Sequence, residues 1–248
     1  MSRTVVITGA SSGIGRALAV EFHRRGYHLG LTARRLGALE ELREELHRSG
    51  GSERDIVIAA LDVDQTESVG PTLHSLFGEL GRVDTVVVNA GVNNFTSIGK
   101  GNLLQEQQLL QTNLLGAIAT VNAAAEYFIR VGGGRIVGIS SLAALQAIPK
   151  QAAYCASKAG FSMYLDAARI ELKRRNIGVT TILPGFVITD IMPKLDKYPF
   201  AITAEKAARE MVDVIEKGQA LGVVPALPWK WLRPLLGHMP DALWKKLA

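Results

Sequence analysis

Short runs of apolar residues alternate along this chain with longer segments in which apolar residues recur every three or four positions. The short runs are almost wholly apolar, which is typical of strands that are covered on both faces of a parallel sheet. They predict strands at Thr4–Thr8, Tyr27–Thr32, Asp55–Leu61, Val83–Gly91, Gly134–Ser140, Ile177–Leu183 and Leu221–Ala226. The longer segments predict helices at Gly15–Arg25, Leu36–Arg48, Thr66–Leu80, Leu103–Arg130, Gln151–Arg174 and Thr203–Lys217.

This regular alternation predicts the fold class. Strand–helix–strand units with right-handed crossovers build an α/β fold, a doubly wound parallel sheet between two layers of helices. Such a sheet binds ligands at the carboxyl ends of its strands, where the strand order reverses. Because the 248 residues show no internal repeat or linker, we expect a single domain over residues 1–248, with a tail at residues 221–248.

Composition and charge narrow the class of protein. With 48% hydrophobic and 21% charged residues the chain suits a globular fold rather than a disordered one, and its single cysteine, Cys155, excludes an internal disulfide. The N-terminus lacks the pattern of a signal peptide and no apolar run reaches about 18 residues, so we expect a cytoplasmic protein. The net charge of +5 is scattered and accompanies no nucleic-acid motif, so we expect no nucleic-acid partner.

A glycine-rich turn, "TGASSGIG", joins the first predicted strand to the first helix. Glycines in such a turn allow a tight bend and a close approach of the backbone to a ligand, and the helix that follows offers free N–H groups to a phosphate. The turn therefore predicts a nucleotide site formed by Gly9, Ser11, Ser12, Gly13, Ile14 and Gly15.

The end of the second predicted strand indicates which nucleotide is bound. A carboxylate there would bind the ribose hydroxyl of NAD, but the sequence has Ala33 followed by Arg34 and Arg35. Guanidinium groups match a 2′-phosphate, which favours NADP(H) over NAD(H). Arg34 is the better candidate, because Arg35 also suits the solvated start of a helix.

The segment Gly9–Gly13, "GASSG", also fits the G-x-S-x-G pattern of a serine hydrolase. That alternative requires an acid and then a histidine downstream, and only His238 comes late in the chain. A first strand also leaves no earlier strand to carry an oxyanion loop. None of the five histidines has the spacing of metal ligands, so we expect no metal.

Tyr154 and Lys158 are four residues apart on a predicted helix, where side chains at this spacing are neighbours. At an effective dielectric constant of about 20, a cation roughly 5 Å away favours the phenolate by roughly 3 kcal/mol. This predicts that Lys158 lowers the tyrosine pKa from about 10 toward 8, where Tyr154 becomes a usable acid. Ser140 or Ser141, at the end of the preceding strand, would hydrogen-bond a substrate carbonyl.

At this point the chain resembles the short-chain dehydrogenase/reductase family over nearly its whole length. The resemblance rests on seven short motifs in the family's order, "TGASSGIG", "LDV", "VNAG", "TNLLG", "ISS", "YCASK" and "PG". It implies a Rossmann-type fold and hydride transfer between a nicotinamide and a carbonyl or alcohol. "VNAG" departs slightly from the commoner "NNAG", and no catalytic position is missing.

The resemblance also assigns roles to residues. It makes Tyr154 the acid/base, gives Lys158 the nicotinamide ribose as a second partner, and makes Ser141 the serine that orients the substrate. Asn113 matches the asparagine of a water-linked proton path. The remaining matches, all to the cofactor, are Asp62, Val63, Asn89, Ala90, Gly91, Pro184, Gly185, Ile188 and Thr189.

Three segments are expected to border the substrate: Gly91–Gly101, Leu142–Lys150 and Phe186–Phe200. They are mainly apolar, which favours a lipophilic ketone or aldehyde, and the prolines of the last segment suit a lid. A protein that binds NADP(H) as a sensor, without turnover, is the non-enzymatic alternative, although a sensor needs no proton donor.

The tail holds all three tryptophans, Trp229, Trp231 and Trp244, among lysines and an arginine. We expect it to cover the protein's own pocket or a partner subunit, with contact to a membrane surface as the alternative. Because many members of the family are dimers or tetramers, the resemblance implies a homodimer or homotetramer.

Overall fold

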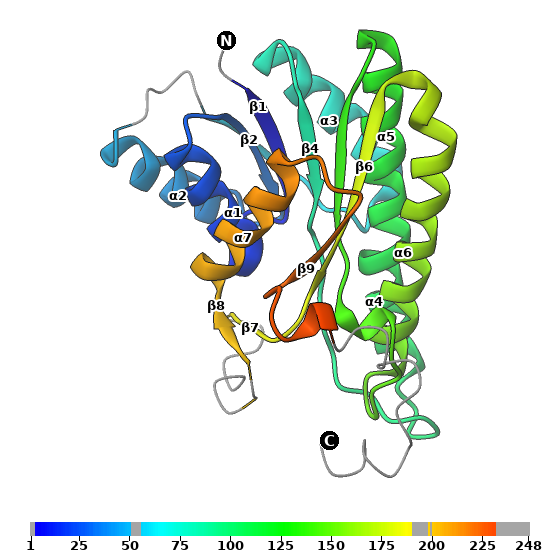
Figure 1. Ribbon diagram of the computed structural model, residues 1–248. Helices are drawn as coiled ribbons and strands as arrows, with labels where there is room; N and C mark the ends of the chain where they lie inside the picture. The colour runs from blue at the N-terminus through cyan, green and yellow to red at the C-terminus, as the bar shows by residue number, and fades with distance from the viewer. Residues whose placement is uncertain (1–2, 51–55, 190–197, 199, 232–248) are drawn as a thin grey trace.

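The computed structural model describes residues 3–50, 56–189, 198 and 200–231. Its centre is a seven-stranded sheet with the order β3-β2-β1-β4-β5-β6-β9, in which every neighbouring pair is parallel (Figure 1). The strands are β1 (Thr4–Thr8), β2 (His28–Ala33), β3 (Ile56–Ala60), β4 (Thr85–Val88), β5 (Gly134–Ile139), β6 (Ile177–Pro184) and β9 (Leu221–Val224). A separate short pair joins β7 (Val187–Ile188) to β8 (Ile202–Thr203).

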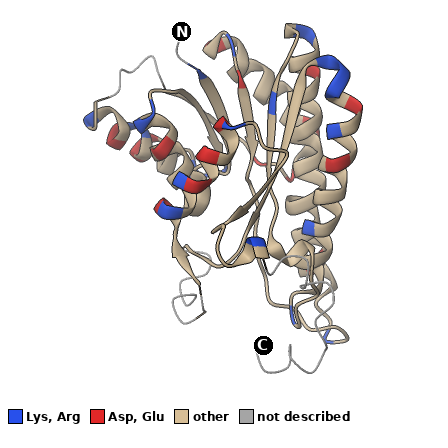
Figure 2. Ribbon diagram, in the orientation of Figure 1, with Lys and Arg blue, Asp and Glu red and all other residues tan. Residues whose placement is uncertain are grey.

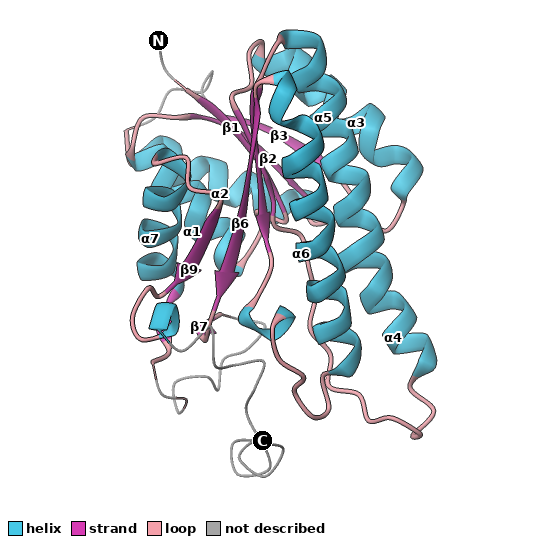
Figure 3. Ribbon diagram, turned by 45° about the vertical axis from the view of Figure 1, so that its right-hand side comes forward, coloured by secondary structure: helices cyan, strands magenta, loops and turns pink. Residues whose placement is uncertain are grey.

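Helices cover both faces of the sheet, which confirms the predicted three-layer fold (Figures 1 and 3). One layer contains α1 (Gly13–Arg24), α2 (Leu36–Arg48) and α7 (Ala204–Glu216). The other contains α3 (Thr66–Leu80), α4 (Leu103–Leu110), α5 (Ala117–Val131) and α6 (Ala152–Leu172). Single turns of 3-10 helix, η3 (Leu142–Ala144) and η4 (Lys173–Arg175), precede and follow α6.

The sheet divides the hydrophobic core into two clusters, one on each face, and the residues of β1 contribute to both. Successive side chains of a strand point to opposite faces, so Val5 and Ile7 pack under α1 and α7 while Val6 packs with α3 and α5. All three are fully buried. The strand is apolar on both faces because both faces are covered, which is why the sequence shows runs rather than alternation.

The structure departs from the single α-helix that was predicted over Leu103–Arg130. This segment is continuous in space but consists of α4, a π-helical turn η2 (Gln111–Gly116) and α5. A Cβ on Gly116 would lie 2.6 Å from the carbonyl oxygen of Val63, so glycine lets this turn approach the loop after β3. By length and composition the whole run is long and apolar enough to cross a membrane, but the buried apolar residues of α5 pack in the core against the sheet, and a core helix passes the same test.

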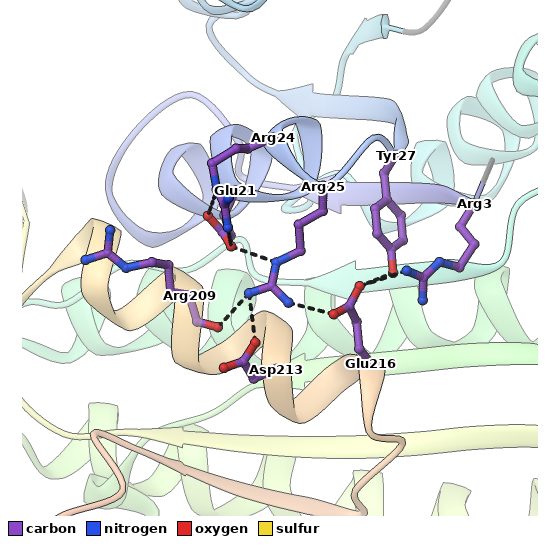
Figure 4. A network of polar contacts seen from close by, with 8 residues as sticks. All are labelled: Arg3, Glu21, Arg24, Arg25, Tyr27, Arg209, Asp213 and Glu216. Atoms are coloured by element: carbon purple, nitrogen blue, oxygen red, sulfur yellow. Dashed lines mark hydrogen bonds and ion pairs between the residues drawn. The ribbon is translucent and has the colours of Figure 1, made fainter.

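Charged side chains form a network at the amino end of the sheet, where α1 and α7 both end (Figure 4). Arg25 donates to Glu21, Asp213 and Glu216 at 2.7, 2.8 and 2.6 Å. Glu216 also accepts hydrogen bonds from Arg3 at 2.8 Å and, at 3.0 Å, from the hydroxyl of the tyrosine that precedes β2. The network therefore connects α1 and α7 with the starts of β1 and β2.

The strand order reverses between β1 and β4, since the chain moves outward from β1 through β2 to β3 and then returns to the other side of β1. In an open α/β sheet this reversal leaves a crevice beyond the carboxyl ends of the two strands. The loops after β1 and β4 therefore begin side by side, and this places the site described next.

Candidate active site

A cavity of about 1010 Å³ lies beyond the carboxyl ends of the strands. It receives residues from the loops after all strands from β1 to β6, and Trp229 from the segment after β9. The predicted site residues that line it are Gly9, Ser11, Ser12, Gly13, Ile14, Gly15, Arg34, Arg35, Asp62, Val63, Asn89, Ala90, Gly91, Ser141, Tyr154, Lys158, Pro184, Gly185 and Thr189. Residues that lie far apart in the sequence are thus brought to one place.

Ile188 is not among the residues that line this cavity. It lies in β7 and lines a smaller hollow beside Ala204, whereas Val187 lines the cavity and Thr189 borders both. The expected contact of Ile188 with the nicotinamide therefore stays a prediction, whereas Thr189 lies on the cavity wall.

The glycine turn is held by the end of β4. Gly9 has φ +68°, and a Cβ there would lie 2.7 Å from Cα of Ala90, so only glycine fits this bend. The Thr8 hydroxyl accepts hydrogen bonds from the backbone N–H groups of Asn89 and Ala90 at 3.1 and 3.2 Å. The Asn89 amide in turn donates to the Thr8 and Gly9 carbonyls at 2.9 and 3.2 Å. Asn89 therefore positions the turn, and Thr8 is a supporting residue that sequence reasoning missed.

The start of α1 suits a phosphate. Its first turn holds no acidic residue, and Ser12, at the cap position, makes no side-chain capping hydrogen bond. The free N–H groups and the helix dipole would favour an anion here. Arg35 reaches the same turn, since its Nη2 donates to the Ser11 hydroxyl at 3.2 Å, and Arg34 is exposed on the cavity wall beside it. Both arginines thus lie where an anionic nucleotide would bind.

The two serines after β5 have different surroundings. The Ser140 hydroxyl is buried, donates to the Lys158 carbonyl at 3.0 Å and shares a hydrogen bond of 2.7 Å with Ser162. Ser141 caps η3, where its hydroxyl accepts a hydrogen bond from the Ala143 N–H at 3.1 Å. It also forms a hydrogen bond with Tyr154. Ser140 is therefore a structural residue, and Ser141 is the serine beside the tyrosine.

Tyr154 and Lys158 project from the first turns of α6 into the cavity. Lys158 Nζ lies 5.9 Å from the centre of the Tyr154 ring and donates to the Ile139 carbonyl at 2.9 Å. Burial raises the pKa of Tyr154, against the hydrogen bond with Ser141, which lowers it. Burial also lowers the pKa of Lys158 to about 8.

The expectation that Lys158 draws the Tyr154 pKa toward 8 is therefore wrong in this arrangement. The spacing of four residues does place the two side chains together, but both charged forms are disfavoured by desolvation. The tyrosine remains protonated at neutral pH, and the lysine is the group that titrates near physiological pH.

Asn113 lies behind the cavity wall rather than on it. It is 1% exposed, and its amide donates to the Val92 carbonyl at 2.8 Å and accepts from the Val92 N–H at 2.8 Å. The same amide nitrogen lies 3.3 Å from the Ser157 hydroxyl. Asn113, in the π turn, thus connects the loop after β4 to α6 by hydrogen bonds. The part of Asn113 in a proton path stays a prediction.

An aromatic cluster forms the far wall of the cavity. The ring of Phe186 lies 4.9 Å from Tyr198 and 5.7 Å from Trp229, and Phe200 lies 6.1 Å from Trp229. Trp229 Nε1 lies over Gly185, where a Cβ would come within 2.7 Å. Trp229, at the start of the tail, therefore lines the protein's own cavity, and whether the rest of the tail covers this pocket or a partner subunit stays a prediction. Trp244, Pro193 and Pro199 lie outside the described residues.

The hydrolase alternative finds no support in this arrangement. The Ser11 hydroxyl accepts from Arg35, and no histidine of the described chain lines the cavity. His238 lies outside the described residues. Within residues 3–50, 56–189 and 200–231, no three His, Cys, Asp or Glu side chains are grouped to hold a metal ion.

Comparison with known proteins agrees with this geometry. Residues 3–199 match the family described as short chain dehydrogenase. An uncharacterised oxidoreductase of Mycobacterium tuberculosis is 34% identical over 245 residues, which cover 98% of this chain and 96% of the relative.

Solved structures show the same fold. An alcohol dehydrogenase from Thermococcus sibiricus complexed with 5-hydroxy-NADP has a TM-score of 0.81 and 27% identity, covering 90% of this chain and 95% of its own. A short chain dehydrogenase/reductase from Burkholderia phymatum in complex with NAD has a TM-score of 0.83 and 21% identity, covering 94% and 92% of the two chains, and is similar in fold. The chain belongs to the short-chain dehydrogenase/reductase family of oxidoreductases.

Proposed function

We propose that this oxidoreductase reduces a lipophilic ketone or aldehyde to an alcohol with NADPH. One observation carries the proposal: a single cavity joins the glycine turn and two arginines at one end to Ser141, Tyr154 and Lys158 at the other. The walls beyond Tyr154 are mainly apolar, which suits a substrate with little charge.

The residues of the cavity fit a dinucleotide. The N–H groups at the start of α1 would hold its phosphates, and Asp62 and Val63 border the region expected to take the adenine. Arg34 and Arg35 would bind a 2′-phosphate, and Ala33, the last residue of β2, adds no carboxylate to repel it. This arrangement supports a preference for NADP(H) over NAD(H).

Ser141, Tyr154 and Lys158 each have a different role at the carbonyl oxygen of the substrate. A bound nicotinamide supplies the hydride. Ser141 orients the oxygen by a hydrogen bond, and Tyr154, whose raised pKa keeps it protonated, donates the proton as negative charge develops. Lys158, 6% exposed and without a carboxylate partner among the described residues, would stabilise that charge while it remains an ammonium.

The test is oxidation of NADPH and of NADH with a panel of carbonyl compounds of increasing lipophilicity. We expect turnover with NADPH, and a double variant Arg34→Ala, Arg35→Ala should lose most of the preference over NADH while retaining turnover. If the protein binds NADPH but turns over no carbonyl of the panel, it is the sensor rather than a reductase.

We also propose that the protein acts as a homodimer or homotetramer in the cytoplasm. The outer faces of η2 and α6 support self-association, since Leu115, Met163 and Ile170 are large apolar side chains that are 48%, 70% and 71% exposed. Light scattering on the purified protein should give the mass of two or four chains, and a monomer at micromolar concentration would contradict it.

A further inference from the structure

Exposed apolar side chains gather around the mouth of the cavity. We call the loops that carry them the apolar rim, residues 92–104, 145–151, 198, 200–203 and 225–231. Within the described chain, eight of the fourteen exposed large apolar side chains lie in this rim, and they are 42% to 85% exposed. They include Phe95, Ile98, Leu104, Phe200, Leu227 and Trp231.

The rim is continuous with the cavity and lies at one end of the molecule. Its segments follow β4, β5, β7 and β9, and all project beyond the carboxyl end of the sheet, in the lower part of the two views (Figures 1 and 3). Phe95, Lys150 and Tyr198 belong to the rim and also line the cavity. The apolar side chains therefore surround an opening rather than form a closed patch.

The rim also has one sign of charge. Its described residues include Lys100, Lys150 and Lys230, all exposed, and no Asp or Glu. Figure 2 shows basic but no acidic residues along these loops. Of the neighbouring carboxylates, Glu106 and Glu210 are partly buried, and Glu210 accepts a hydrogen bond from the Ala226 N–H at 3.1 Å; Glu205, two residues beyond the rim in the first turn of α7, is exposed.

We propose that the apolar rim docks on the surface of an anionic lipid bilayer. Apolar and aromatic side chains on loop tips enter the boundary between headgroups and acyl chains, while lysines extend their charged ends to the lipid phosphates. A protein partner is favoured less, because a stable protein interface has its apolar part at the centre, and the centre of the rim is the cavity opening.

Docking in this orientation places the cavity mouth against the lipid. A lipophilic carbonyl compound would then pass from the bilayer to Tyr154 without crossing water, a consequence that rests on the proposed function. The docking itself rests on exposure and charge, so it is measured without any turnover.

The test is co-sedimentation of the full-length protein with vesicles. One set contains phosphatidylcholine alone and the other an equal mixture of phosphatidylcholine and phosphatidylglycerol. We expect binding to the mixed vesicles that weakens as salt is added. The variant Lys100→Gln, Lys230→Gln should bind them up to roughly thirtyfold more weakly, since each lysine near an anionic surface contributes about fivefold.

A second variant tests the apolar contribution, with a matched control. Ile98→Ser, Leu104→Ser, Trp231→Ser should remain in the supernatant at lipid concentrations that sediment the unchanged protein. Ile129→Ser, Val131→Ser removes exposed apolar side chains of α5 at the opposite end of the sheet and should sediment normally. None of these residues lines the cavity, so turnover of a water-soluble carbonyl should be unchanged in both variants.

Three outcomes would overturn the proposal. Recovery of the unchanged protein with neither vesicle would contradict docking outright. A change in the mass measured by light scattering in the rim variant would make the rim a contact between copies of this chain. Loss of binding on removal of residues 232–248, with binding retained in the rim variant, would assign binding to the tail. Absence of turnover with every carbonyl would contradict the proposed function and leave the vesicle result intact.

Discussion

Each end of the sheet holds a partly or fully buried cationic side chain, but the two cations have different hydrogen-bond partners. At the amino end, Arg25 has three carboxylate partners and also lies 3.4 Å from the Arg209 carbonyl oxygen (Figure 4). At the carboxyl end, Lys158 is buried more deeply than Arg25 and, within the described part of the chain, has one hydrogen bond, to the Ile139 carbonyl. One cation is fully satisfied, and the other is held with little compensation.

The pKa shifts follow from this difference. Although burial alone would lower it, hydrogen bonds with Asp213, Glu21 and Glu216 raise the pKa of Arg25. Burial of Lys158 meets no such opposition, and its pKa falls to about 8. Charges that are paired stabilise the fold, whereas a charge left near its titration point is available for chemistry. The comparison predicts that changes at the two ends affect different measurements.

Tyr154→Phe should have the largest effect, and only on chemistry. Loss of the hydroxyl removes the proton donor and should lower kcat by roughly 10²-fold or more. NADPH affinity and the thermal unfolding temperature should stay close to those of the unchanged protein, because the ring remains. Fluorescence titration with NADPH beside steady-state kinetics decides this, and loss of NADPH binding would show that Tyr154 is structural instead.

Arg25→Ala should have the converse effect. It leaves Glu21, Asp213 and Glu216 without their shared partner and should reduce the free energy of unfolding by about 2 kcal/mol. Well below the unfolding temperature, kcat and KM should be unchanged. Arg24→Ala is the matched control: Arg24 also donates to Glu21, at 2.9 and 2.8 Å, but its side chain is 65% exposed, and an ion pair with so exposed a side chain contributes little to the free energy of unfolding. Equal losses in the two variants, measured by urea unfolding, would contradict the special role of Arg25.

The pH dependence of carbonyl reduction should follow Lys158. Its pKa of about 8 means that the ammonium is present below pH 8 and lost above it, while Tyr154, with its raised pKa, stays protonated across this range. The rate should therefore be level near pH 7 and fall about tenfold per pH unit well above pH 8. Lys158→Arg keeps a cation throughout, so its residual activity should not fall near pH 8; an identical fall would point to another group.

The sequence predicted the fold and most of the site because the motifs adjoin strand ends, and a parallel sheet brings those ends together. It did not predict the π turn at Asn113, since one extra residue in a turn barely changes the apolar periodicity. It gave the wrong direction for the Tyr154 pKa, because a spacing of four residues shows neither the burial that raises this pKa nor that the Lys158 ammonium is turned to the Ile139 carbonyl. The contact of Trp229 with Gly185 joins segments that no local pattern relates.

Trp229→Phe should produce the smallest effect and sharpens the comparison further. Trp229 Nε1 is buried, and among the described residues it has no hydrogen-bond partner, so the cavity end contains an unpaired donor as well as a cation that lacks a carboxylate partner in the same described part of the chain. Phenylalanine keeps an aromatic ring against Phe186 and Phe200 and removes that donor. The free energy of unfolding should therefore be unchanged or higher by about 1 kcal/mol, whereas Trp229→Ala should lower it by about 3 kcal/mol through lost packing. If thermal unfolding shows Trp229→Phe to be as destabilising as Trp229→Ala, the indole N–H does have a partner, and the two ends of the sheet differ less than we infer.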